Sequence, residues 1–105
     1  MVTRKIAIEK IKGFVADLQK VGYHPTAIYL FGSVAKGLQH KDSDIDVAIW
    51  DDKFTGCIPV DIEPIIPIKL KYKRLEVHTY HSSETVDSDP FIGEILAHGI
   101  RIELA

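Results

Sequence analysis

Two short patterns in this chain combine residue types that suit a phosphorylated ligand and its counter-ions. Gly32-Ser33 is followed, after ten residues, by Asp44-x-Asp46. Gly32 has no Cβ, so the backbone there can come close to a ligand. Free backbone N–H groups and the Ser33 hydroxyl, at the start of a helix, suit a phosphate. In an extended strand, Asp44 and Asp46 point the same way with Cα atoms about 6–7 Å apart, an arrangement that favours hard cations such as Mg2+.

The Gly-Ser pair is expected between a strand and a short helix. Ala27–Phe31 is an uninterrupted apolar run, which predicts a strand covered on at least one face. Residues from Val34 to about Gln39 are predicted to form a short helix, because Gly37 keeps it brief. Gly32-Ser33 would then lie where the strand ends and the helix begins.

The two aspartates belong to a second predicted strand, from Asp44 to Trp50. Its side chains alternate between a core face and an opposite face. The core face is Ile45, Val47 and Ile49, and the opposite face is Asp44, Asp46, Ala48 and Trp50. A solvated acidic face would show the same alternation, so the metal-site hypothesis depends on the link to Gly32-Ser33.

A third carboxylate is expected from a later strand, Leu75–Tyr80. There Glu76, His78 and Tyr80 share one face. Adjacent strands lie about 4.8 Å apart, so Glu76 could join the aspartate pair if the two strands are neighbours. We interpret His78 as a surface residue rather than a ligand. Two other acidic residues stay open as alternatives for the third carboxylate, Asp61 and Glu63.

The remaining segments read mainly as scaffold. A first helix is predicted from an N-cap at Thr3 to about Lys20, with a stripe of Ile8, Ile11, Val15 and Leu18. Residues 51–73 contain three prolines, so we expect a loop and one short helix opening at Pro64. A last helix follows a cap at Ser88 or Asp89, buries Ile92, Ile95 and Leu96, and stops at Gly99. Ile100–Leu104 is expected as a closing strand.

The spacing of Gly32-Ser33 and Asp44-x-Asp46 resembles the signature of the DNA polymerase β-type nucleotidyltransferase superfamily, and the short minimal nucleotidyltransferases most of all. The proline-phenylalanine helix before Gly-Ile-x-Ile is similar to the tail of that group, so the resemblance runs from about residue 27 to the end. It implies an α/β (α+β) fold with a small mixed sheet flanked by helices. It also implies that Glu76 takes the position of the third carboxylate, where aspartate is more frequent. Lys36 stands where the family often has arginine.

The resemblance further implies a nucleotidyltransferase that uses two Mg2+ ions, with ATP as the default nucleotide and a hydroxyl as acceptor. Asp44 and Asp46 would hold both metals, and Glu76 would bind the metal beside the acceptor hydroxyl. Gly32 and Ser33 would hold the triphosphate. Minimal nucleotidyltransferases often pair with a small helical HEPN-type protein, and some act as antitoxins that attach AMP to a tyrosine of that partner. The alternative is a non-catalytic antitoxin or nucleotide-binding module that acts by protein–protein contact.

Length and composition set the remaining bounds. The 105 residues predict one domain, 1–105, and 46% hydrophobic residues suffice for one core. A net charge of −2 argues against stable nucleic-acid binding, and the basic cluster Lys69–Arg74 is read as a solvated edge. The single cysteine, Cys57, excludes an internal disulfide and fits a reducing cytosol. No apolar run approaches ~18 residues, so we expect a cytoplasmic protein without a membrane span. A homo-oligomer stays open.

Overall fold

The computed structural model describes residues 2–38 and 43–103. Their elements follow the chain as α1 Arg4–Lys20, β1 Ala27–Phe31, α2 Gly32–Lys36, β2 Ile45–Trp50, α3 Ile58–Ile62, the 3₁₀ turn η1 Glu63–Ile65, α4 Ile66–Lys69, β3 Leu75–Tyr80, α5 Pro90–His98 and β4 Ile100–Arg101. The bounds of β1 and β3 agree with the predicted strands. β2 begins one residue later than predicted, so Asp44 lies just before it.

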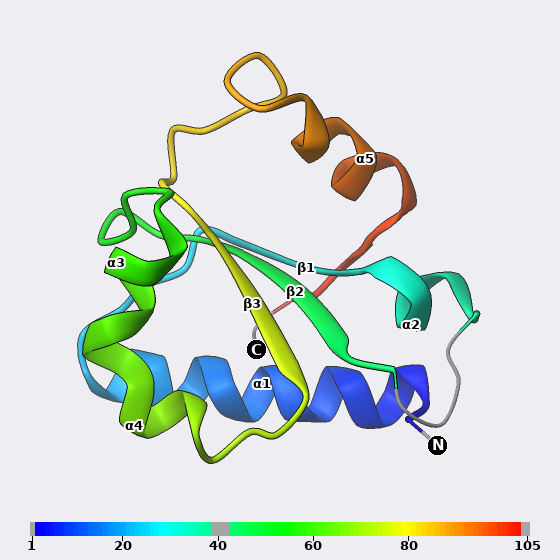
Figure 1. The fold of residues 1–105 in the computed structure, drawn as a ribbon, viewed down its shortest axis with the longest axis horizontal. Coiled ribbons are helices and arrows are strands. Elements are labelled where there is room, and N and C mark those ends of the chain that lie inside the picture. Colours follow the sequence, from blue (N-terminus) through cyan, green and yellow to red (C-terminus); the bar gives the residue numbers. More distant parts are fainter. Residues whose placement is uncertain (1, 39–42, 104–105) are drawn as a thin grey trace.

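The strands form one mixed sheet in the order β3-β2-β1-β4. β1 runs antiparallel to both β2 and β4, whereas β2 and β3 are parallel. Parallel neighbours need a long connection, and the segment α3-η1-α4 supplies it. Helix α1 lies along one face of the sheet, and α5 lies over the opposite face (Figure 1). The predicted mixed sheet flanked by helices is therefore confirmed.

Two apolar clusters hold the layers together. The larger one lies between α1 and the sheet and includes Ala7, Ile11, Phe14, Val15 and Leu18 from α1 with Ile28, Leu30, Ile45, Val47, Ile49, Leu75 and Val77 from the strands. The smaller one lies under α5 and consists of Phe31, Ala48, Trp50, Tyr80, Ile92 and Ile95. Helix α5 therefore buries the Ala48–Trp50 end of β2 on the face that carries Asp46, which stays partly exposed.

The caps of the two longer helices lie where the sequence predicts them. The backbone N–H of Ile6 donates to Thr3 Oγ1 over 3.2 Å at the start of α1. The N–H of Phe91 donates to Asp89 Oδ1 over 3.0 Å at the start of α5. Each cap satisfies a backbone donor that has no partner inside its helix. No helix among residues 2–38 and 43–103 is long and apolar enough to span a membrane.

The prediction of a single short helix in residues 51–73 is wrong. Three consecutive helical segments form there, and each carries a proline at its first or second position: Pro59 in α3, Pro64 in η1 and Pro67 in α4. The first N–H groups of a helix have no intrahelical acceptor, so a proline at that point loses no hydrogen bond. These prolines begin successive helical turns, where the sequence analysis took them as breaks.

Three boundaries also differ from expectation. Helix α2 begins at Gly32 and ends before Gly37, whose left-handed backbone (φ 73°) closes it; Gln39 lies outside the described residues. Leu96 was expected in the core but is 49% exposed, because α5 faces the sheet mainly through Ile92 and Ile95. Strand β4 has only two residues, and Leu104 lies outside the described part of the chain.

Candidate active site

Gly32 and Asp46 are in direct contact at the end of the β1–β2 ladder. Phe31 is the register partner of Asp46, so the chain turns into α2 beside that carboxylate. Gly32 has a left-handed backbone (φ 78°), and a Cβ placed on it would overlap Asp46 Oδ2 and lie 3.1 Å from Asp46 Cγ. We expected this glycine to admit a ligand. The structure shows that it admits the carboxylate of Asp46, which joins the two sequence patterns physically.

The other residues of the two patterns flank this contact. Ser33 lies in the first turn of α2 and is half-buried, and its carbonyl accepts a hydrogen bond from the Leu38 N–H over 2.9 Å. Asp44 precedes β2 and is exposed. The site therefore combines a fixed carboxylate at Asp46, an exposed carboxylate two residues earlier, and the start of α2.

Glu76 reaches the same region through the pairing of β2 with β3. In this parallel ladder Asp46 is the register partner of Glu76, and residues in register project from the same face of a sheet. Glu76 is exposed at this point. Glu76 was expected to join the aspartate pair only if the two strands were neighbours. They are, and the structure places Glu76 next to Asp46.

Asp61, an alternative for the third carboxylate, is buried and is held in the fold by hydrogen bonds. It is 4% exposed, and it accepts hydrogen bonds from the Thr79 hydroxyl (2.6 Å) and from Thr55 N–H and Oγ1 (2.8 and 2.9 Å). Thr79 alternates with Glu76 and His78, so Asp61 approaches β3 from the opposite face. Burial alone would raise the pKa of Asp61, but these hydrogen bonds outweigh it and hold the pKa below 3.8. Glu63, the other alternative, is exposed in η1.

The carboxylates fit a hard cation, although they do not form a closed cage. Among residues 2–38 and 43–103, no group of three His, Cys, Asp or Glu side chains is already close enough to hold a metal ion. Mg2+ keeps several waters and takes only one or two carboxylates from a protein. Asp46 and the exposed Asp44 and Glu76 offer that kind of open, oxygen-only donor set.

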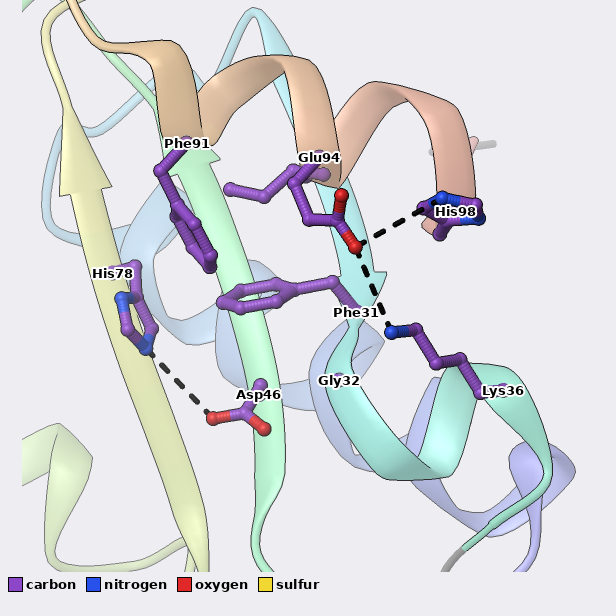
Figure 2. Close-up of a pocket in the computed structure, with 9 residues that line it drawn as sticks. Phe31, Gly32, Lys36, Asp46, His78, Phe91, Glu94 and His98 are labelled. Atoms are coloured by element: carbon purple, nitrogen blue, oxygen red, sulfur yellow. Dashed lines mark ion pairs between the residues drawn. The ribbon is translucent and has the colours of Figure 1, made fainter.

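A cavity of about 380 Å³ opens beside Asp46, between α5, α2 and the sheet (Figure 2). Aromatic rings form one side of it: the Phe31 ring lies edge-to-face against His78 (4.9 Å between centroids) and against Phe91 (5.7 Å). His78 Nε2 lies 3.8 Å from Asp46 Oδ1. Sequence reasoning took His78 for a surface residue, although the alternation of β3 already placed it on the face of Glu76.

Charged side chains lie across the cavity from these rings. Glu94 of α5 pairs with Lys36 of α2 over 3.6 Å and with His98 over 3.9 Å, as Figure 2 shows. All three are about half exposed, so the pairs add little to stability. Their effect is to place the Lys36 ammonium, the His98 imidazole and one carboxylate together in the lining of the cavity. Glu94 and His98 escaped the sequence analysis because only the docking of α5 brings them to the site.

The family follows from a match over most of the chain. A family model described as a nucleotidyltransferase domain matches residues 8–92, a range that contains Gly32, Asp46 and Glu76. The chain belongs to this family. It is therefore a nucleotidyltransferase, as the spacing of Gly32-Ser33 and Asp44-x-Asp46 predicted.

Two other comparisons bear on this nucleotidyltransferase. No curated protein sequence matches it. One similar solved structure is described as the crystal structure of the toxin-antitoxin with AMP-PNP; its TM-score is 0.58, with 20% identity over 90% of this chain and 73% of that chain. At this level of identity the similarity shows the fold, and it agrees with the predicted polymerase β-type architecture. Members of the family generally use divalent metals.

Proposed function

We propose that this nucleotidyltransferase transfers AMP from ATP to a hydroxyl of a partner protein, with Mg2+ as cofactor. The observation that carries the proposal is the register of Asp46 with Glu76 beside the Gly32 contact. The acceptor we propose is a tyrosine of a helical HEPN-type toxin, so that the chain acts as its antitoxin. The similarity to a toxin–antitoxin structure with AMP-PNP supports that choice.

Mg2+, held by Asp44, Asp46 and Glu76, would offset the negative charge that develops on the transferred phosphoryl group. Gly32 lets the carboxylate of Asp46 lie against the start of α2, so Asp46 would adjoin a triphosphate held there. The Ser33 hydroxyl and nearby backbone N–H groups would hold the triphosphate. Glu76 would lie beside the acceptor hydroxyl and favour loss of its proton as the oxygen attacks the α-phosphorus and pyrophosphate leaves.

The cavity next to Asp46 suits the nucleoside. Its volume of about 380 Å³ falls within the range of small-ligand sites, roughly 300–1,000 Å³. The exposed ring of Phe91 and the ring of Phe31 provide apolar surfaces against which a purine can pack. Lys36 at the mouth adds a positive charge for the phosphates. We therefore place ATP with its base in this cavity and its phosphates towards Asp46.

The test is a transfer assay with the purified chain, ATP, Mg2+ and a helical protein encoded beside it. The partner should gain the mass of one AMP group. Glu76→Gln should leave ATP affinity nearly unchanged and slow transfer by ~100-fold, because acceptor activation is lost. Glu63→Gln is the matched control and should transfer at the wild-type rate, since Glu63 lies in η1. Equal rates for the two variants would contradict the assignment of Glu76.

The second candidate is that the chain, as an antitoxin, neutralises its partner by contact and transfers nothing to it, which the similarity to a toxin–antitoxin structure also supports. Calorimetry separates the two. For the enzyme, Mg2+ should strengthen ATP binding to the wild type but not to Asp44→Ala/Asp46→Ala. If the partner is bound and inactivated without a change in its mass, contact alone explains the neutralisation.

A further inference from the structure

A second cavity, of about 290 Å³, lies at the other end of the sheet from Asp46. Trp50 and Tyr29 contribute from the sheet, Ile92 and Leu96 from α5, and Arg101 from β4. None of the residues that line it lines the cavity beside Asp46. The nucleotidyl-transfer chemistry described above makes no use of it.

The shape and lining of this cavity favour an aromatic body. The Trp50 and Tyr29 rings meet edge-to-face with centroids 5.8 Å apart. Leu96 and Val86 also line the cavity and are both about half exposed, so its apolar wall is accessible from solvent. An apolar cavity of about 150 Å³ holds one benzene ring. A volume of about 290 Å³ is therefore suited to a two-ring compound.

One cationic and one anionic residue line the cavity, Arg101 and Glu84. The guanidinium of Arg101 lies 5.9 Å from the centroid of the Tyr29 ring. Its acidic partner Glu103 (3.0 Å) does not line the cavity, and such an exposed pair is weak enough for another anion to compete. Glu84 also lines it and keeps its negative charge, but its carboxylate is held at the His81 N–H (2.8 Å) and beside Gly56, and its carbonyl accepts Trp50 Nε1 over 3.1 Å. Among the residues that line the cavity Arg101 alone is cationic, so it is the group that can pair with an anion.

We propose that this cavity is a binding site for a small aromatic anion. The rings of the ligand pack against Trp50 and Tyr29, and its anionic group pairs with Arg101. The site is separate from the candidate active site, and α5 contributes side chains to both.

The chain carries its own reporter for this site, because Trp50 is its only tryptophan. Naphthoate is the probe, and naphthylmethylammonium is the comparison of similar size and opposite charge. Naphthoate should quench Trp50 fluorescence saturably, and the cation should bind at least about tenfold more weakly, because a hydrogen bond to a charged group contributes ~1.5–3 kcal/mol. Equal quenching by both probes, or no saturation with naphthoate, would overturn the proposal.

Matched variants locate the probe. Arg101→Gln should weaken naphthoate binding about tenfold, whereas Lys12→Gln, at an exposed position on α1, should not. Leu96→Glu should also weaken it, because it places a negative charge on the apolar wall, whereas Leu70→Glu, at a 74% exposed leucine of another surface, should not. Both changed positions are about half exposed or more, so the fold should persist, as near-ultraviolet circular dichroism can check.

A final comparison separates the two cavities. Asp46→Asn should leave naphthoate affinity unchanged, because Asp46 lines only the first cavity. A loss as large as that of Arg101→Gln would place the probe in the candidate active site and refute the second site. The same conclusion would follow if either control variant weakened binding as much as its partner.

Discussion

Replacing Gly32 by alanine should destabilise the chain in two separable ways. The left-handed backbone at position 32 (φ 78°) costs a residue with a Cβ about 1–2 kcal/mol. The new methyl group would also overlap Asp46 Oδ2, so the carboxylate must leave its position at a cost of about 0.5–1.5 kcal/mol. We therefore expect Gly32→Ala to lower the free energy of unfolding by about 2–3 kcal/mol.

A double-mutant cycle with Asp46→Ala isolates the contact. Without the carboxylate the overlap with Asp46 Oδ2 and Cγ is gone, and the backbone term is the main one left, because the Cβ at position 46, at 3.3 Å, needs to shift by only a few tenths of an ångström. Gly32→Ala should then cost about 1–2 kcal/mol, which leaves a coupling energy of about 1 kcal/mol, within the usual range for residues in contact. Urea unfolding of the four variants measures each term.

Gly22→Ala is the matched control for the backbone term. Gly22 is also left-handed (φ 96°), but a Cβ there meets only the flexible end of Lys53, at 3.0 Å. Gly22→Ala should lower the free energy of unfolding by the same amount in wild type and in Asp46→Ala. If Gly32→Ala lowers the free energy of unfolding by the same amount in wild type and in Asp46→Ala, the carboxylate does not require the glycine and this account of the Gly-Ser pair is wrong. Gly32→Ala should also slow nucleotidyl transfer by ~100-fold, because a displacement of about 1 Å at a catalytic group can lower the rate by that factor.

Two further predictions concern buried or bonded ionisable groups. Asp61→Asn should lower the free energy of unfolding at pH 7 by about 2–3 kcal/mol, because the amide cannot accept from all the donors that Thr79 and Thr55 direct at Asp61. The native pKa of Asp61 lies below its unfolded value of 3.8, so the stability that it contributes is present above pH 3.8 and is lost as the pH falls through the native pKa. The urea midpoints of wild type and Asp61→Asn should therefore differ at neutral pH and converge below about pH 4. A hydrogen bond to Asp17 (2.7 Å) and burial raise the pKa of Tyr72 to about 12, so its stabilising effect is present below pH 10 and is lost as the pH rises through about 12. Tyr72→Phe should therefore flatten the alkaline fall in the urea midpoint, and an unchanged fall would refute this source of alkaline sensitivity.

Local patterns in the sequence were sufficient for most of the elements. Strands β1 and β3 and the caps at Thr3 and Asp89 agree with prediction because each depends on neighbouring residues only. Side-chain alternation and capping are short-range effects. One short helix was predicted where residues 58–69 form three helical segments, because a proline that begins a turn and one that breaks a helix look alike until the helix boundaries are known.

The candidate site, too, depends partly on local sequence and partly on which strands pair. The spacing of Gly32-Ser33 and Asp44-x-Asp46 already indicated the chemistry and the family. Sequence could not decide between Glu76 and Asp61, which are both acidic residues in plausible segments. The parallel pairing of β3 with β2 puts Glu76 in register with Asp46, whereas Asp61 lies against the opposite face of β3. Which strands become neighbours depends on contacts between residues distant in the chain, so only the tertiary structure could decide it.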